Sequence, residues 1–120
     1  MWEMKENLIK TKSYQLAIDV VNLYKHLNKN FKEDILSKQF LKSGTSIGAN
    51  VREGIDAQSK ADFIHKFTIA LKEASETVYW IDLLKDTDYL TNEEYKSIYD
   101  KANQVYRIIH SIVKSSRNKS

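Results

Sequence analysis

The sequence contains no cysteine and no proline, and it has only three glycines among its 120 residues. Without cysteine, neither a disulfide framework nor a zinc site with thiolate ligands can form. No apolar run approaches the roughly 18 residues that a membrane span requires, so we expect no membrane contact. The amino terminus has neither the apolar stretch of a signal peptide nor the composition of a transit peptide. These absences predict a soluble cytoplasmic protein, with residues 1–120 forming a single domain.

The lack of proline, and the confinement of glycine to one short stretch, favours long helices. No segment alternates apolar and polar residues with a period of two, so we expect no strands. The apolar spacing predicts helices over residues 12–29 and 35–58, a third helix after Ser59 and a fourth after Thr91. The predicted fold is therefore all-α, an antiparallel up-down-up-down four-helix bundle. We expect residues 1–10 and 116–120 to be poorly ordered.

Two of the predicted helices begin with a capping signal. Ser59 is followed three residues later by Asp62, and Thr91 is followed three residues later by Glu94. This is the spacing of a capping box, in which the two residues satisfy each other's backbone N–H groups. After Thr91, apolar residues recur every three or four positions, as in a helix packed in a bundle. These residues are Tyr95, Ile98, Ala102, Val105, Ile109 and Ile112.

All three glycines lie in the stretch SGTSIGANVREG, residues 43–54. On a helical wheel, Gly44, Gly48 and Gly54 fall within or at the edge of the apolar arc of the helix predicted over 35–58. Three glycines in a helix cost about 3 kcal/mol relative to three alanines. Close approach of a neighbouring helix would offset that cost, so we predict that all three are helix-packing residues. A turn or kink near residues 43–46 is the alternative.

The same stretch does not form a phosphate-binding loop or a catalytic elbow. A Walker loop needs four residues between its glycines and then a lysine, whereas three residues separate Gly44 from Gly48 and no lysine follows. Ser46 lies between these glycines, but Thr45 and Ile47 belong to a helical pattern and not to the strand-to-helix turn of a nucleophile elbow. We therefore predict no catalytic residues and no enzymatic activity on a small-molecule substrate.

A four-helix bundle can hold a di-iron centre, which requires two Glu-x-x-His pairs and two further carboxylates. The chain offers only one distant imitation of such a pair, formed by Asp62 and His65. His26 and His110 have no acidic residue at helical spacing on their amino-terminal side. We therefore predict that the protein has no metal site and no cofactor.

Two predicted helices carry more apolar surface than a bundle core needs. The apolar residues of the helix over 12–29 sweep about 220° of the wheel, wider than an ordinary amphipathic stripe. The third helix has a second apolar stripe beside Glu73 and Glu76, for which a solvated face with a single tryptophan is the alternative. Monomers rarely expose such patches, so we predict a homo-oligomer. The predicted interface residues are Leu16, Val20, Leu23, Leu27, Ile69, Trp80 and Leu83.

The net charge of +3 is unevenly distributed along the chain. Residues 51–100 contain 6 Lys and Arg against 11 Asp and Glu, whereas residues 101–120 contain 5 Lys and Arg and no acidic residue. This basic end favours an anionic partner. The alternative is that its cations only complement the negative end of the last helix dipole, an effect of ~0.3–1 kcal/mol.

Part of this positive charge repeats at helical spacing. Arg107, Lys114 and Arg117 are separated by seven and three residues, with His110 between them, so they share one helical face. Phosphate groups of RNA would be neutralised by such a face, and their contact would weaken as salt rises. The residues predicted to contact nucleic acid are Lys101, Arg107, Lys114, Arg117 and Lys119.

A specific polar pattern also runs through the glycine-bearing stretch. It resembles Ser-x-x-Ser-Ile-x-x-Asn-x-x-Glu-Gly, a motif carried here by Ser43, Ser46, Ile47, Asn50, Glu53 and Gly54. Together with SKADF (59–63), IALKEASETVYWIDLL (69–84) and TDYLTNEEY (87–95), it makes the sequence similar to the four-helix-bundle family named after 23S rRNA intervening sequences. The resemblance extends from about residue 7 to residue 113. The polar motif residues form one edge beside the apolar arc, as expected of a packed helix with a hydrogen-bonding border.

The resemblance implies an up-down-up-down bundle that assembles with copies of itself into a ring, typically a homopentamer. Members of the family were noticed as open reading frames inside insertions of bacterial 23S rRNA genes. A relative, the accessory variability determinant of diversity-generating retroelements, forms a similar ring and works with a reverse transcriptase and its RNA. The implied function is a non-enzymatic ring that binds RNA or a nucleoprotein partner. The alternative is an oligomeric protein–protein adaptor without nucleic-acid contact.

Overall fold

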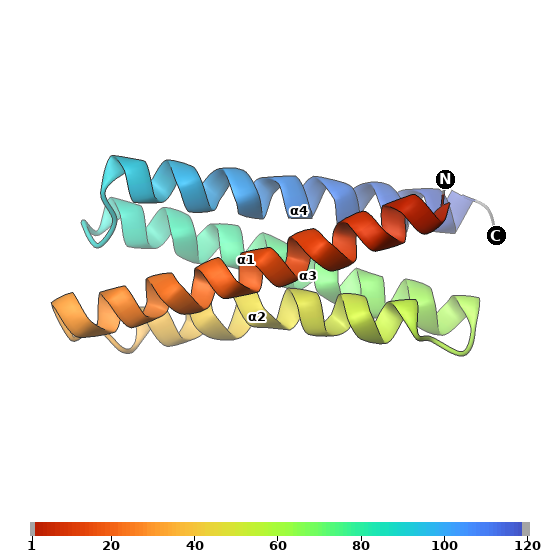
Figure 1. Ribbon diagram of the computed structural model, residues 1–120, viewed down its shortest axis with the longest axis horizontal. Coiled ribbons are helices and arrows are strands. Elements are labelled where there is room, and N and C mark those ends of the chain that lie inside the picture. Colours follow the sequence, from red (N-terminus) through yellow and green to blue (C-terminus); the bar gives the residue numbers. More distant parts are fainter. Residues whose placement is uncertain (1, 119–120) are drawn as a thin grey trace.

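The computed structural model describes residues 2–118, and these residues contain helices but no strand. The four helices are α1 (Trp2–Phe31), α2 (Leu36–Ile55), α3 (Lys60–Asp86) and α4 (Asn92–Asn118). Figure 1 shows them side by side, each running antiparallel to the one before it. The predicted all-α, up-down-up-down four-helix bundle is therefore confirmed.

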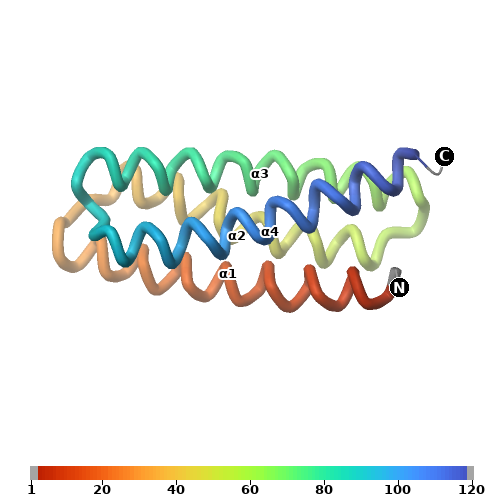
Figure 2. Tube along the Cα trace, turned by 90° about the horizontal axis from the view of Figure 1, so that it is seen from above, coloured from red at the N-terminus to blue at the C-terminus, as the bar shows by residue number. Residues whose placement is uncertain are grey.

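The helices are arranged as the corners of a square, so each has two neighbours. α1 packs against α2 and α4, and α3 packs against the same two helices. The second view shows α4 crossing obliquely between α1 and α3, with α2 behind it (Figure 2). The bundle measures 47 × 21 × 19 Å, and its longest dimension is close to the length of the 30-residue helix α1, about 45 Å at 1.5 Å per residue.

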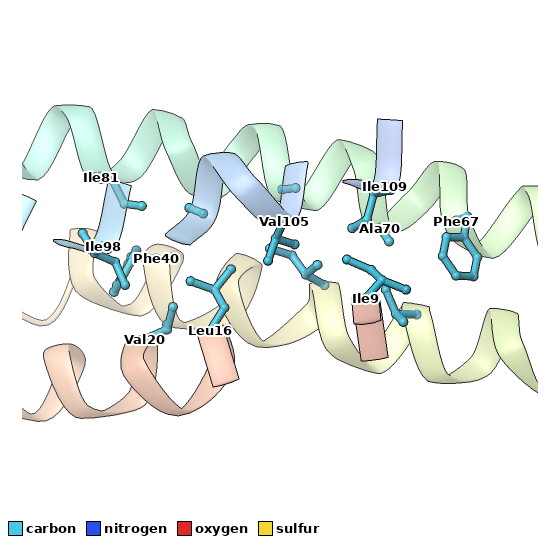
Figure 3. Close-up of a cluster of buried hydrophobic side chains, with 14 of the residues drawn as sticks. Ile9, Leu16, Val20, Phe40, Phe67, Ala70, Ile81, Ile98, Val105 and Ile109 are labelled. Carbon is cyan, nitrogen blue, oxygen red and sulfur yellow. The ribbon is translucent and has the colours of Figure 1, made fainter. Parts of the chain in front are cut away.

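The core lies along the common axis, and all four helices contribute to it (Figure 3). Its side chains are apolar residues three, four or seven positions apart, which is the spacing that keeps them on one side of each helix. The largest fully buried side chains are Ile9, Leu16, Val20, Leu27, Phe40, Ile47, Val51, Phe67, Ile81, Leu84, Ile109 and Ile112.

Both predicted capping signals mark the starts of helices. The Ser59 hydroxyl accepts a hydrogen bond from the backbone N–H of Asp62 at 3.1 Å. At the start of α4, the Thr91 hydroxyl accepts from the N–H of Glu94 at 3.1 Å, and the Glu94 carboxylate accepts from the N–H of Thr91 at 2.9 Å. The second pair is a complete capping box, which fixes the first turn of α4.

The start of α2 has a cap that the sequence patterns did not reveal. The carboxylate of Glu33 accepts hydrogen bonds from the N–H groups of Ile35, Leu36 and Ser37 at 2.7–3.0 Å. Partial burial acts to raise the pKa of Glu33, but these three donors outweigh it and hold the pKa below its usual value. Glutamate is an uncommon residue before a helix, so the preference for Ser, Thr, Asp and Asn at this position did not identify it.

The helix bounds differ from prediction mainly at α1. The helix begins at Trp2 and not at residue 12, so residues 2–10, predicted to be poorly ordered, are its first turns. Ile9 is fully buried in the core, which ties these turns to the bundle. The apolar pattern missed them because Met4 and Leu8 lie on the exposed side. At the other end of the chain, α4 continues through Asn118.

The predicted passage of α2 through all three glycines is confirmed, because the helix is continuous from Leu36 to Ile55. A Cβ added at Gly44 would lie 2.7 and 2.8 Å from the two methyl carbons of Val20 on α1. A Cβ added at Gly54 would lie 2.6 Å from the ring of Phe67 on α3. At Gly48 the nearest atom would be the Ser13 carbonyl oxygen at 3.4 Å, an ordinary contact. The prediction that all three glycines permit close packing is therefore wrong for Gly48.

Candidate functional site

The basic residues of α4 predicted to contact nucleic acid lie on its outer side. Arg107, Lys114 and Arg117 are exposed, and we call these three residues the α4 basic face. No carboxylate among the residues that the structure describes forms an ion pair with Arg107 or Lys114. Arg117 donates a hydrogen bond to the Thr68 hydroxyl of α3 at 3.3 Å, which directs its guanidinium along the α3–α4 boundary.

A shallow hollow of about 220 Å³ adjoins the α4 basic face between α3 and α4. The apolar part of its lining comes from Leu71 and Val113. The polar part includes His110, Lys114 and Arg117. The imidazole of His110 is stacked on the Tyr106 ring, with centroids 6.0 Å apart. The hollow therefore combines the ammonium of Lys114, the guanidinium of Arg117 and an imidazole ring, which suits an anion better than a neutral ligand.

Lys101 does not belong to this face, although the sequence analysis grouped it there. Its ammonium pairs with Asp19 of α1 at 2.9 Å, on the other side of α4. Lys101 lies six residues from Arg107, which turns the two about 120° apart around the helix. The remaining predicted contact, Lys119, lies outside the described residues.

Along their shared boundary, α1 and α4 are joined by polar contacts that involve both positively and negatively charged side chains. Besides the Asp19–Lys101 pair, Lys12 donates a hydrogen bond to Gln104 at 3.2 Å, and His26 lies 3.2 Å from the Glu94 carboxylate. Two open hollows of about 520 and 400 Å³ lie along this boundary. Because its charges are mixed and paired, this groove offers less attraction to phosphate than the α4 basic face.

The predicted self-association residues divide into two groups. Leu16, Val20 and Leu27 are at most 1% exposed and belong to the core of the single chain, so the prediction that they form an interface is wrong. The wide apolar sweep of α1 arises because this helix packs against both α2 and α4. Leu23 is partly buried against the same core. The three residues on α3, namely Ile69, Trp80 and Leu83, are only partly buried in the single chain.

These three residues share the outer side of α3 with two carboxylates. We call Ile69, Glu73, Glu76, Trp80 and Leu83 the α3 outer face. The Trp80 indole donates to the Glu76 carboxylate at 3.3 Å. Burial and the neighbouring charge of Glu76 raise the pKa of Glu73, and a hydrogen bond with Ser46 and the nearby Lys72 and Lys42 oppose this only in part. The face therefore combines apolar surface with negative charge that is only partly compensated.

Among the six residues of the family motif, Ser43, Glu53 and Gly54 contact α3. Ser43 is buried, and its hydroxyl accepts a hydrogen bond from the Thr77 hydroxyl at 3.0 Å. Asn50 donates to the backbone carbonyl of Ser46 at 2.9 Å, within the helix. Glu53 pairs with Lys66 of α3 at 2.9 Å. Ile47 is fully buried, and Gly54 lies against Phe67 as described above.

The structure reveals one further surface, which the sequence analysis missed. The guanidinium of Arg52 lies 5.2 Å from the ring centroid of Tyr14, across the boundary of α1 and α2. The two residues border a hollow of about 260 Å³. We call it the α1–α2 hollow, and its lining includes Ser13, Tyr14, Ala17, Thr45, Gly48 and Arg52. Small residues on two helices could have indicated it, but only once the two helices are known to face each other.

Two further searches concern metals and membranes. Within residues 2–118, no three His, Cys, Asp or Glu side chains come together in an arrangement that could hold a metal ion. None of the helices described here is both long enough and apolar enough to cross a bilayer.

Comparisons with known proteins agree with the fold and the motif. Residues 5–111 match the family model described as 23S rRNA-intervening sequence protein. The chain is also similar to a crystal structure from Bacteroides thetaiotaomicron, of a protein with unknown function from the S23 ribosomal protein family. The two are 53% identical over 92% of this chain and 98% of that chain, with a TM-score of 0.89. No curated protein matches this chain.

Proposed function

We propose that this chain, which belongs to the 23S rRNA-intervening sequence protein family, is a non-enzymatic RNA-binding protein. We propose further that it works as a ring of identical copies. The observation that carries the proposal is the α4 basic face, where Arg107 and Lys114 are exposed without a carboxylate partner among the described residues. The family's link to 23S rRNA genes directs the proposal to RNA. A homopentamer is the ring that the family resemblance favours.

The mechanism is neutralisation of backbone phosphates. Each cation that replaces a counterion of the RNA releases it, so the affinity falls as salt rises, with a slope of about −0.7 per phosphate contact for single strands. One copy offers only three such residues, too few for tight binding alone. Several copies in one assembly would hold the same RNA at high effective concentration, which multiplies weak contacts. Few contacts to base edges are expected, so sequence preference should be weak.

The test is RNA retention by the parent and by the triple variant Arg107→Glu, Lys114→Glu and Arg117→Glu, as a function of salt. A matched control reverses three exposed lysines elsewhere, Lys5→Glu, Lys29→Glu and Lys60→Glu, with the same change in net charge. We expect the parent and the control to retain RNA at low salt and to lose it steeply as salt rises. We expect the α4 variant to lose retention while keeping the parent's mass.

Two outcomes would contradict the proposal. If the control loses retention as completely as the α4 variant, net charge and not the α4 basic face is responsible. If the parent retains no RNA at low salt, the alternative function takes its place: an oligomeric protein–protein adaptor without direct nucleic-acid contact. The partly buried apolar residues of the α3 outer face would then be the first surface to examine for its partner.

A further inference from the structure

Gly48 has no explanation within the single chain. Gly44 and Gly54 each lie against a side chain that leaves no room for a Cβ, whereas a Cβ at Gly48 would make only an ordinary contact. Glycine in a helix interior is about 1 kcal/mol less favourable than alanine, so the chain gains nothing from it here. The absence of a side chain at this position makes the α1–α2 hollow deeper, because Gly48 is one of the residues that line it.

The surroundings of this hollow have the properties of an unoccupied contact surface. Tyr14, which lines the hollow, is 53% exposed, and Ile18, four residues along the same helix, is 38% exposed, so exposed apolar surface continues from the hollow along α1. Arg52 lies over the Tyr14 ring, and no carboxylate of the described residues pairs with it. The hollow therefore suits an occupant with an apolar side chain and negative charge.

The α3 outer face has the complementary properties. Its indole and two aliphatic side chains are only partly buried. Glu73 and Glu76 are three residues apart on one helix, where like charges repel. The partial burial of Glu73 adds to this repulsion, because a carboxylate that loses water is disfavoured, and the nearby Lys42 and Lys72 offset the cost only in part. A cation from outside the chain would relieve both effects.

We propose that the α3 outer face of one copy docks against the α1–α2 hollow of a second copy, where Arg52 meets the carboxylates of Glu73 and Glu76. This inference rests on the self-assembly in the proposed function and names the two surfaces that carry it. Docking of the α3 outer face on itself is disfavoured because it would bring like charges together. Two different surfaces on one chain make a heterologous contact, which closes into a ring or continues as a filament.

Charge reversal tests the pairing. We expect Arg52→Glu alone, and Glu73→Arg with Glu76→Arg, each to lower the light-scattering mass from a multiple toward the single-chain value of 14.0 kDa. Combining the three substitutions in one chain should restore the parent's mass, because both partners are then reversed. Lys60→Glu is the control and should leave the mass unchanged. Failure of the combination to restore assembly would overturn the pairing.

A second variant tests the hollow without changing charge. Gly48→Leu should fill the α1–α2 hollow and abolish assembly, while Gly48→Ala should leave room for the partner and keep it. Circular dichroism should show that both remain helical, since a Cβ at Gly48 would make only an ordinary contact with Ser13. A helical Gly48→Leu variant that assembles like the parent would overturn the proposal.

RNA retention measured on the same samples separates this inference from the proposed function. If the parent is an oligomer and none of the variants changes its mass, only the docking model fails. If the parent is an oligomer that follows the docking model but retains no RNA, only RNA binding fails. A parent that is monomeric at every concentration overturns both the docking model and the proposed ring.

Discussion

The three glycines of α2 differ in what their missing side chains permit. The missing side chain at Gly44 leaves room for the two methyl groups of Val20, and the missing side chain at Gly54 leaves room for the ring of Phe67. Val20 is β-branched and fully buried, so it cannot turn aside easily. A Cβ at Gly48 would make only an ordinary contact with Ser13, and Gly48 lines the α1–α2 hollow. One residue type in one helix therefore has a packing role at two positions and none within the chain at the third.

Alanine substitution separates these roles. Gly44→Ala should lower the free energy of unfolding by about 1–3 kcal/mol, because its Cβ overlaps with Val20. Gly48→Ala should raise the free energy of unfolding of the single chain by about 0.5–1 kcal/mol, because alanine is the better helix former and has room. Urea unfolding of both variants in a dissociated background such as Arg52→Glu provides the measurement. Equal stability of the two variants would contradict this account.

The hydrogen bond between Tyr95 and Asp82 should make the stability of the folded protein depend on pH in the alkaline range. Tyr95 donates to the Asp82 carboxylate at 2.8 Å, and this bond, with burial, raises the pKa of Tyr95 to about 12. The folded state therefore favours the protonated phenol, a contribution that is complete below pH 10 and is lost between pH 10 and 12. We expect Tyr95→Phe to reduce the loss of stability over this window. Urea unfolding at pH 9 and 11.5 tests it, and identical pH dependence in parent and variant would exclude it.

At the scale of the element, the ends of the helices are fixed by side chains close in sequence. The start of α4 is capped by the reciprocal Thr91–Glu94 pair, and the start of α3 by the hydroxyl of Ser59. The start of α2 is capped by the carboxylate of Glu33. Each cap satisfies N–H groups that have no partner inside the helix. Short connections between helices can therefore hold definite ends without proline.

The Glu33 cap is testable through its charge. Glu33→Ala should lower the free energy of unfolding by about 1 kcal/mol at neutral pH, the typical effect of losing a cap. The folded state lowers the pKa of Glu33, so its contribution is present above the unfolded pKa and is lost as pH falls through the folded value. The difference between parent and variant should therefore shrink in acid. Asp100→Ala is the control, because Asp100 is exposed and forms no ion pair with any of residues 2–118. Urea unfolding at pH 7 and pH 3 gives both differences, and a difference that does not change with pH would contradict a charge-based cap.

At the scale of the whole molecule, three surfaces differ in the sign of their charge and in their apolar content. Exposed cations gather on α4, carboxylates and an indole on α3, and an arginine beside a hollow on α1 and α2. Neighbouring helices present different surfaces because each helix turns only its core side inward. One chain can therefore meet copies of itself through two surfaces and leave a third for an anionic partner.

The burial of Trp80 by a second copy should be visible in its fluorescence. In a Trp2→Phe background, Trp80 is the only remaining tryptophan. It is partly exposed in the single chain, so its emission should shift to shorter wavelength as concentration rises and copies associate. Arg52→Glu in the same background should hold the emission at the dilute value. A wavelength independent of concentration, in samples whose mass does increase, would show that Trp80 lies outside the contact.

The sequence alone determined the helical class, the two capping signals, the continuous glycine-bearing helix and the family, because each depends on residues close together in the chain. It could not determine which apolar stripe is covered. A helical wheel places Leu16 and Val20 on one side of a helix but carries no reference to where the neighbouring helices lie. The tertiary structure alone placed both in the core, turned Lys101 toward Asp19, and left Gly48 open beside Arg52. These outcomes depend on how four helices share one axis, which local spacing does not encode.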